Sequence, residues 1–361
     1  MKNIILFGGS FDPIHNGHIE MAKRASTFLD AEVIFIPAVI SVWKERSADF
    51  IHKVNMINLA IKDYPFLKVS LYESTTGKDV NYSIDTIKYF KTVYPNDNLY
   101  MLIGEDQVKE FHRWRDAEEI SKLVNIIFFE RPDYEDVNGN VSRFNMIIID
   151  EYKTSAASTN IRDLVDVDTP LEVLEYIASN NLYYMEKIRP LISEKRMSHS
   201  LEVAKLCYKI AYKSNKINPN KAYVAGLLHD IGKEIEAAEV VKIMEEHYPE
   251  YISLPRFSYH QFVGEYIAKT VFGIKDEEVL EAIRYHATGN ANMSDLGKIV
   301  YASDKIEPTR GFDSSDLIAA CYENYENGFI VVLEANKEYL LVTKKDINNA
   351  LTAKCFAQYL K

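Results

Sequence analysis

Residues 8–18 of this 361-residue chain read Gly-Gly-Ser-Phe-Asp-Pro-Ile-His-Asn-Gly-His, and this stretch decides the fold of the N-terminal half. It follows a short apolar run, Ile4 to Phe7, that is typical of a buried strand, and it precedes a helical pattern that begins near Gly17. Glycines between a strand and a helix let backbone N–H groups approach a phosphate, and the helix N-terminus adds a favourable dipole. The stretch therefore predicts a phosphate-binding turn at Gly8 and Gly9.

Two histidines lie at the start of the predicted helix. His15 and His18 are three residues apart, so both rings can face one anion. Two imidazoles in this position would bind phosphate oxygens and stabilise the charge that grows on a phosphorus atom during transfer. The alternative is an ordinary strand-to-helix turn that happens to contain histidines.

The first 150 residues alternate strand-like apolar runs with helical patterns. Continuous apolar runs are typical of strands buried on both faces, and their alternation with helices indicates a mostly parallel sheet flanked by helices. The predicted strands are Ile4 to Phe7, Val33 to Ile36, Leu67 to Leu71, Leu99 to Ile103, Ile126 to Phe129 and Met146 to Ile149.

A change of fold class is predicted near residue 190. From Leu191 onward strand patterns nearly vanish, and long helical patterns such as His199 to Lys213 and Ala222 to Leu228 take over. Pro190 disfavours helix through the preceding residue, and 361 residues exceed what one core usually organises. We expect an α/β domain over residues 1–187 and an all-α domain over residues 188–361.

The composition excludes several classes of protein. Hydrophobic residues make up 47% and charged residues 26%, as in ordinary globular proteins, and a net charge of -11 argues against sequence-independent binding of nucleic acid. The three cysteines are far apart and odd in number, which favours reduced thiols. Neither a signal peptide nor an apolar run as long as a membrane span is visible, so we expect a cytoplasmic protein without membrane partners.

Several segments of the first half resemble the nucleotidyltransferase superfamily and, within it, nicotinate-nucleotide adenylyltransferase. Besides the string at residues 8–18, residues 81–86 (NYSIDT), 104–107 (GEDQ) with Trp114, and 158–162 (STNIR) match the family's segments in order. The resemblance implies a Rossmann-like domain that transfers AMP from ATP, with Mg²⁺ assisting, to nicotinate mononucleotide. Pyrophosphate would leave without a covalent enzyme intermediate.

The resemblance also implies roles for individual residues. His15, His18 and Arg162 would be catalytic, Trp114 would offer its π-face to the pyridine ring, and Asp106 would contact the ATP ribose. Further substrate-binding residues are expected among small, hydroxyl-bearing and basic side chains: Gly8, Gly9, Ser10, Phe11, Lys44, Tyr82, Thr86, Gly104, Ser158 and Thr159.

Each of these roles has an alternative. Trp114 could be a partly buried aromatic residue, Asp106 a helix cap, and Arg162 a surface charge. The sequence also departs from the family pattern: Ala157 replaces a serine, Glu105 replaces a small residue, and the segment around residues 39–45 lacks the usual prolines. The departures affect the substrate geometry rather than the reaction class.

The C-terminal half contains a second set of candidate residues. A His-Asp doublet and four separated His and Asp residues can supply the mixed nitrogen and oxygen ligands that Fe, Mn or similar ions accept. Asp230 could bridge two ions, one bound with His199, His229 and Asp304 and the other with His260 and His286. Alternatively, isolated histidines are often hydrogen-bonded core residues, as we expect for His247.

The strings around these residues resemble the HD phosphohydrolase superfamily, most closely its YqeK-type members, over about residues 190–320. The resemblance implies hydrolysis of dinucleoside polyphosphates, notably diadenosine tetraphosphate to two ADP, at a dinuclear iron-type or manganese-type centre with Asp230 catalytic. Candidate phosphate contacts are Lys233, Arg284, Thr288 and Arg310, any of which could instead be a solvated surface residue.

Two rival functions stay open. The same folds could use other substrates, such as a phosphopantetheine-like acceptor in the first domain or nucleoside monophosphates in the second. Alternatively, the second domain could sense nucleotides and regulate the first domain without hydrolysing them. The six potential ligands favour hydrolysis, because a sensor does not need them all.

Overall fold

The computed structural model describes residues 1–39, 47–78, 80–130, 136 and 138–360. The chain forms two compact units, and each is described by itself below. The first unit comprises Met1–Ile161 and Asp168–Tyr176, and the second comprises Arg162–Val167 and Ile177–Lys361. Lys44, which the sequence assigns to substrate binding, lies outside the described residues.

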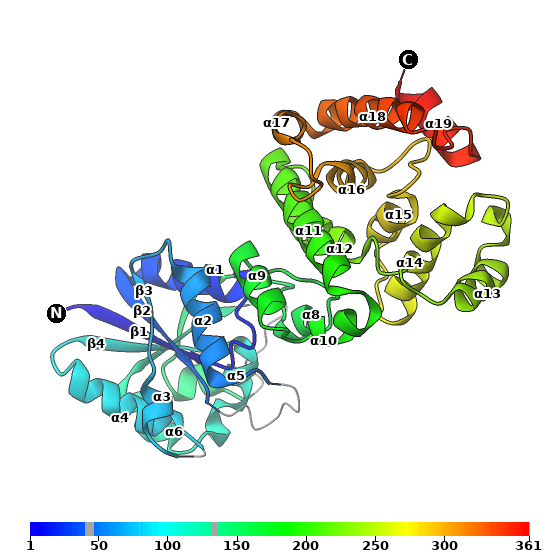
Figure 1. The fold of residues 1–361 in the computed structure, drawn as a ribbon. Helices are drawn as coiled ribbons and strands as arrows, with labels where there is room; N and C mark the ends of the chain where they lie inside the picture. The colour runs from blue at the N-terminus through cyan, green and yellow to red at the C-terminus, as the bar shows by residue number, and fades with distance from the viewer. Residues whose placement is uncertain (40–46, 79, 131–135, 137, 361) are drawn as a thin grey trace. The chain divides into compact units, whose positions relative to one another are not determined.

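The first unit is built on a sheet of six parallel strands in the order β3-β2-β1-β4-β5-β6 (Figure 1). Strand β1 lies at the point where the strand order reverses, between β2 and β4. In open sheets of this kind, ligands bind beyond the carboxyl ends of the strands at this point. The strands are β1 (Asn3–Gly9), β2 (Ala31–Pro37), β3 (Leu67–Val69), β4 (Asn98–Leu102), β5 (Asn125–Glu130) and β6 (Ile147–Glu151).

Helices of the first unit follow the strands in alternation. They are α1 (Asn16–Leu29), α2 (Phe50–Ile61), α3 (Tyr72–Thr75), α4 (Ser83–Val93), α5 (Glu105–Glu110), the 3-10 turn η1 (Phe111–Arg113), α6 (Ala117–Leu123) and α7 (Asn140–Arg143). Two further helices, α8 (Ser158–Arg162) and α9 (Leu171–Ser179), contain two of the three points where the chain passes between the units.

Both faces of the central strands are buried. Ile4 and Leu6 of β1 pack in one core cluster with residues of α4, α5 and α6, while the alternate residues Ile5 and Phe7 are buried on the opposite face. Successive side chains of a strand point to opposite faces, so a strand covered on both sides needs an unbroken apolar run. This explains why the strands were visible in the sequence.

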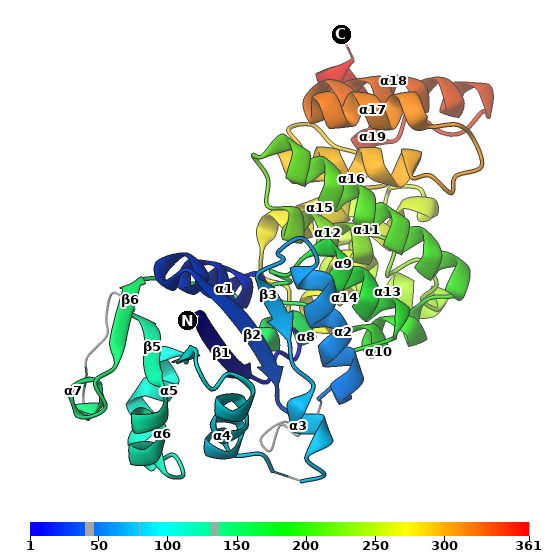
Figure 2. The same cartoon turned by 90° about the vertical axis from the view of Figure 1, so that its left-hand side faces the viewer.

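The second unit is helical throughout its described residues. Figure 2 shows α11, α12, α15 and α16 packed together, and α17 to α19 lie at the C-terminal end. The elements are α10 (Met185–Ile188), η2 (Arg189–Leu191), α11 (Glu194–Ser214), α12 (Pro219–Leu228), α13 (Ala237–His247), η3 (Pro249–Tyr251), η4 (Arg256–Ser258), α14 (Tyr259–Thr270), α15 (Glu277–Tyr285), α16 (Asp295–Ile306), α17 (Ser315–Glu323), α18 (Tyr325–Val342) and α19 (Ala350–Tyr359).

The predicted fold class is confirmed: a parallel α/β sheet precedes an all-α region. All six predicted strands form, and the largest shortening is at β3, which ends at Val69 rather than Leu71. The three cysteines are buried free thiols. Within the described residues, no helix combines the length and the apolar character needed to cross a membrane.

Candidate functional sites

The first candidate site lies at the carboxyl ends of β1 and β4. Phe7 on β1 pairs with Leu102 on β4, so the turns that follow these two strands leave the same edge of the sheet. Gly8 and Gly9 end β1, and Gly104 is the N-cap of α5. Strand register thus brings the first two predicted glycine segments to the place where a parallel sheet of this order binds ligands.

His15 and His18 form a stacked pair at the start of α1. Their ring centroids are 3.5 Å apart, with 22° between the ring planes. Nδ1 of His15 accepts the backbone N–H of His18 at 3.3 Å, and Nδ1 of His18 accepts that of His15 at 3.4 Å. Because Nδ1 acts as acceptor in each ring, a neutral ring carries its proton on Nε2, which is then a hydrogen-bond donor. The pair can therefore offer two N–H donors to an anion at a helix N-terminus.

The segment before α8 and the start of that helix hold this turn in place. The Ser158 hydroxyl donates to the Pro13 carbonyl at 2.8 Å, which brings one of the predicted hydroxyl groups to the turn. A Cβ atom at Gly17 would lie 2.9 Å from the side chain of Thr154 and 3.0 Å from Nδ1 of His15. Glycine at position 17 is thus required by the close approach of Thr154 to the histidine pair.

Other predicted residues of the first site vary in exposure. Asp106 and Thr159 are exposed, Ser10 is half-buried, and Phe11 is buried with its ring edge-on to that of His18 at 4.9 Å. A Cβ atom at Gly104 would lie 2.6 Å from Oδ1 of Asp106. These exposures suit residues at the edge of a substrate site.

Tyr82, Thr86 and Trp114 have structural surroundings of their own. Tyr82 is 40% exposed and lies against the Arg115 guanidinium, whose carbon is 4.5 Å from the ring centroid. Thr86 is buried, and its hydroxyl has no hydrogen-bond partner within the described part of the chain. Trp114 is half-buried on the main core cluster, 5.1 Å from the Phe111 ring. Arg162 ends α8 and is the first residue assigned to the second unit.

A buried lysine beside the first site was not predicted. Lys53 on α2 is fully buried and donates to the Ala38 carbonyl at 3.0 Å. Burial lowers the pKa of Lys53, while the nearby Asp12 and Glu73 carboxylates act in the opposite direction. Burial raises the pKa of Glu73 to about 7. In the sequence Lys53 looked like any polar residue of an amphipathic helix, so no signal pointed to it.

The second candidate site gathers six side chains from five segments of the second unit. His199 is on α11, His229 and Asp230 follow α12, His260 is on α14, His286 follows α15, and Asp304 is on α16. Three overlapping groups of these residues have ligand atoms within 4.8 Å of one another. The structure therefore brings together all six residues that the sequence assigns to metal binding.

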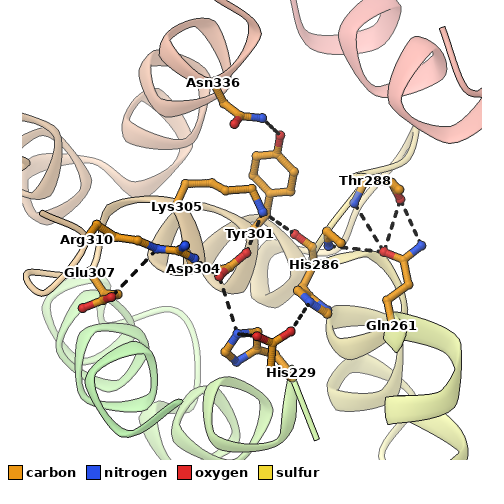
Figure 3. Close-up of polar contacts among 12 residues, drawn as sticks. His229, Gln261, His286, Thr288, Tyr301, Asp304, Lys305, Glu307, Arg310 and Asn336 are labelled. Carbon is orange, nitrogen blue, oxygen red and sulfur yellow. Dashed lines mark hydrogen bonds and ion pairs between the residues drawn. The ribbon is translucent and has the colours of Figure 1, made fainter. Parts of the chain in front are cut away.

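His199, His229 and Asp304 form one group of ligand atoms, and the two histidines of this group lie near one oxygen of Asp230. Nε2 of His199 is 3.2 Å from Oδ1 of Asp304 and 3.3 Å from Nε2 of His229. Oδ2 of Asp230 lies 3.7 Å from Nε2 of His229 and 3.9 Å from Nε2 of His199. Figure 3 shows His229 facing Asp304 across this group.

The other oxygen of Asp230 faces the remaining two histidines. Oδ1 lies 3.3 Å from Nε2 of His260 and 3.4 Å from Nε2 of His286. The two histidine nitrogens are 3.1 Å apart. Asp230 thus stands between two groups of ligand atoms, one on each of its oxygens.

The four histidines are oriented for metal binding by their other ring nitrogen. Nδ1 of three of them donates to the carbonyl three residues earlier: His229 to Gly226 at 2.7 Å, and His260 to Phe257 and His286 to Ile283 at 2.8 Å each. Nδ1 of His199 instead lies 3.1 Å from the buried Glu307 carboxylate. Donation from Nδ1 leaves the lone pair on Nε2, which is the arrangement that metal-ligating histidines require. The residues present therefore fit a divalent metal.

Cations surround the two carboxylates of the cluster. Arg196 lies 2.5 Å from Oδ2 of Asp230, and Lys305 lies 2.6 Å from Oδ2 of Asp304. Arg310 pairs with Asp304 as well, as Figure 3 shows. Burial would raise the pKa of Asp304, but the Lys305 charge and the neighbouring His199 and His229 side chains hold this pKa well below its usual range. Both carboxylates are therefore anionic ligands at neutral pH, since burial is likewise outweighed for the pKa of Asp230.

The predicted phosphate contacts of this half lie in different places. The Lys233 ammonium is 3.2 Å from Nε2 of His260, at the cluster. Arg284 instead pairs with the fully buried Glu265, with its Nε 2.6 Å from the carboxylate. Thr288 is buried and hydrogen-bonded to Gln261 on α14 (Figure 3). The structure thus brings Lys233 and Arg310 to the cluster, whereas the contacts of Arg284 and Thr288 hold α14 and α15 together.

Three residues that the sequence analysis did not single out contact the candidate metal ligands. Arg196, Lys305 and Glu307 contact Asp230, Asp304 and His199 respectively. Arg196 lies three residues before His199 and Lys305 directly follows Asp304, so proximity to a candidate ligand in the sequence was the available signal.

Comparison with known proteins assigns the two candidate sites to two different families. Residues 6–164 match the family model for cytidylyltransferase-like proteins, and residues 196–309 match the model for the HD domain. The fold and the two sites thus define an enzyme with a nucleotidyltransferase region followed by an HD hydrolase region that takes a divalent metal.

Relatives that contain both the nucleotidyltransferase and the HD region narrow this class of enzyme. A protein of Mycoplasma genitalium named "Probable nicotinate-nucleotide adenylyltransferase/Ap4A hydrolase" is 31% identical over 352 residues, covering 92% of this chain and 97% of the relative. The chain belongs to this family of two-part enzymes. The nicotinate-nucleotide adenylyltransferase of Bacillus subtilis is 33% identical and covers 51% of this chain and 99% of its own.

A solved structure also resembles part of the chain. It is titled as a predicted HD superfamily hydrolase involved in NAD metabolism from Clostridium acetobutylicum, is 29% identical, and covers 48% of this chain and 94% of its own with a TM-score of 0.43.

Proposed function

We propose that the N-terminal region transfers AMP from ATP to nicotinate mononucleotide, and that the HD region hydrolyses dinucleoside polyphosphates, with diadenosine tetraphosphate (Ap4A) cleaved to two ADP. The names of the relatives support these substrates. The observation that carries the proposal is that one chain holds two sets of groups for phosphate chemistry, His15 with His18 and the cluster around Asp230.

In the proposed transfer, a phosphate oxygen of nicotinate mononucleotide attacks the α-phosphorus of ATP, and the bond to the β-phosphate breaks. The products are deamido-NAD and pyrophosphate. His15 and His18 would donate hydrogen bonds to the phosphates, Gly8 and Gly9 would let the backbone approach, and Mg²⁺ bound with ATP would neutralise charge. The expected contacts of Arg162, Trp114 and Asp106 belong to this proposal.

In the proposed hydrolysis, a water oxygen attacks a central phosphorus of Ap4A, and the bridging P–O bond between the second and third phosphates breaks. Ions of the Fe or Mn type bound here would supply Lewis acidity that lowers the pKa of the attacking water and offsets phosphate charge. His199, His229, Asp304 and Asp230 would hold one ion, and Asp230, His260 and His286 the other. Lys233 and Arg310 would bind the phosphates that flank the reacting bond.

The mixed donor set supports ions of this type. The six residues offer four imidazole nitrogens and two carboxylates; the imidazoles suit Fe better than Mg²⁺ or Ca²⁺, and the carboxylates suit Mn. We also propose that the boundary between the activities lies near Lys187 and that the protein acts in the cytoplasm, since its composition and reduced thiols suit that compartment.

The experiment that tests this function is a two-part assay of the full chain. ATP is offered with nicotinate mononucleotide, nicotinamide mononucleotide or phosphopantetheine, and pyrophosphate release is measured. Ap4A and AMP are offered separately to manganese-loaded protein, and products are separated by chromatography. Fastest transfer to nicotinate mononucleotide and formation of two ADP per Ap4A are expected. Faster transfer to another acceptor, or nucleotides that stay unchanged on prolonged incubation, would overturn the corresponding half.

A further inference from the structure

A cavity of about 410 Å³ opens beside the metal cluster, between α16, α17 and α18. Two of its lining residues, Lys305 and Arg310, are also the cations that contact Asp304. The cavity therefore begins at a proposed metal ligand and extends away from it. Most of its walls come from residues after 309, where the match to the HD-domain model ends.

The far part of the cavity differs in character from its charged end. Phe312 on the loop before α17 and Tyr339 on α18 both line it, and they are 51% and 53% exposed. Leu317, Val332 and Ala335 supply an apolar wall. The flat faces of these two aromatic side chains suit stacking with a planar ring.

One polar group is fixed in this apolar wall. Asn336 lines the cavity, and its amide nitrogen donates to the hydroxyl of the buried Tyr301 at 2.9 Å (Figure 3). With the amide nitrogen bonded in this way, the amide oxygen is the acceptor that the residue offers. An acceptor beside aromatic side chains fits the N–H edge of a nucleobase.

We propose that this cavity binds the base and ribose of one nucleotide half of the HD substrate, while Lys305 and Arg310 bind the phosphates attached to that half. The inference rests on the proposed hydrolase function and deepens it. The volume of the cavity lies within the range of small-molecule sites. Its lining is cationic beside Asp304 and apolar and aromatic further out, which matches the order of phosphate and base in a nucleotide.

The direct test is photolabelling of the full chain with 8-azido-ADP, followed by peptide mapping. Labelled peptides from residues 312–342 that disappear when ADP competes are expected. The Tyr339→Ala variant should lose this labelling, whereas Tyr212→Ala, which removes an exposed tyrosine from α11 outside the cavity, should keep it. Labelling confined to the N-terminal region, or unchanged in Tyr339→Ala, would overturn the proposal.

Kinetics separate this proposal from the function on which it rests. Phe312→Ala and Tyr339→Ala should each raise the KM for Ap4A roughly 5- to 150-fold, because stacking of a base on an aromatic side chain is worth roughly 1–3 kcal/mol, while kcat changes less than twofold. Inhibition by tripolyphosphate, which has no base, should be unchanged. An equal weakening of Ap4A binding and of tripolyphosphate inhibition in these variants would indicate a structural defect and contradict the proposal. Wild-type protein that labels in the cavity but leaves Ap4A intact would refute the hydrolase function alone.

Discussion

One carboxylate oxygen of Asp230 lies 3.3 Å from Nε2 of His260, while its other oxygen faces the opposite group of ligand atoms. Neighbouring residues of a helix point about 100° apart, so His229 and Asp230 alone could not surround one ion. Their position at the end of α12, with α14 crossing behind them, lets Asp230 contact two groups at once. This relation is the structural basis of the proposed dinuclear centre.

Glu307 should govern metal affinity without being a ligand. Glu307→Gln removes the anionic partner of Nδ1 of His199 at 3.1 Å, so we expect the affinity for Mn²⁺ to fall by roughly 10- to 100-fold. Chelator competition measures this affinity. Glu202→Gln is the matched control, because Glu202 lies on the same helix as His199 and pairs with Lys205 at 2.9 Å. Equal affinity in both variants would show that Glu307 does not orient His199.

Gly232 should be needed for the close approach of α14. A Cβ atom there would lie 2.6 Å from the backbone nitrogen of Gly264 and from the His260 carbonyl, so Gly232→Ala must displace the helix that carries His260. Overpacking of this kind costs about 1–3 kcal/mol, and we expect lower thermal stability together with loss of bound metal.

The graded control for this prediction is Gly264→Ala. Its Cβ atom would meet the His229 carbonyl at 3.3 Å, a contact that small shifts can relieve. Calorimetry should therefore show a smaller loss of thermal stability for Gly264→Ala than for Gly232→Ala. A greater loss in Gly264→Ala would contradict the packing argument.

Glu73 should make the stability of the first unit depend on pH. Burial raises its pKa to about 7 from an ordinary value of 4.5, so the folded protein holds this proton more tightly than the unfolded chain. Its contribution to stability is fully present below pH 4.5 and is lost as the pH rises through about 7. Glu73→Gln should therefore melt at a higher temperature relative to the wild type at pH 8 than at pH 5. A difference in melting temperature that is the same at both pH values would count against this assignment.

Local patterns predicted the fold well because each element carries its own signal. The six strands were visible as apolar runs, and those at the centre of the sheet are buried on both faces. The helix at residues 194–214 was visible from its periodicity, although its N-cap at Ser193 extends it five residues before the predicted start at His199. Such features depend on neighbours in the sequence.

Contacts between distant residues could not be predicted in the same way. Arg284 was expected to bind phosphate, but whether an arginine faces a ligand or a buried acid such as Glu265 depends on packing between α14 and α15. Thr288 is likewise held by Gln261, 27 residues earlier. The six proposed ligands could be predicted because each stands in a distinctive local sequence. Glu307 and Lys53 could not be predicted, because they matter only through their burial.

The two proposed activities of this chain should be separable by single substitutions. The most direct measurement compares His18→Ala with Asp230→Asn in both assays, adenylyl transfer to nicotinate mononucleotide and hydrolysis of Ap4A. We predict that His18→Ala abolishes transfer and keeps hydrolysis, and that Asp230→Asn does the reverse. Loss of metal-dependent hydrolysis in His18→Ala with transfer intact would contradict the claim.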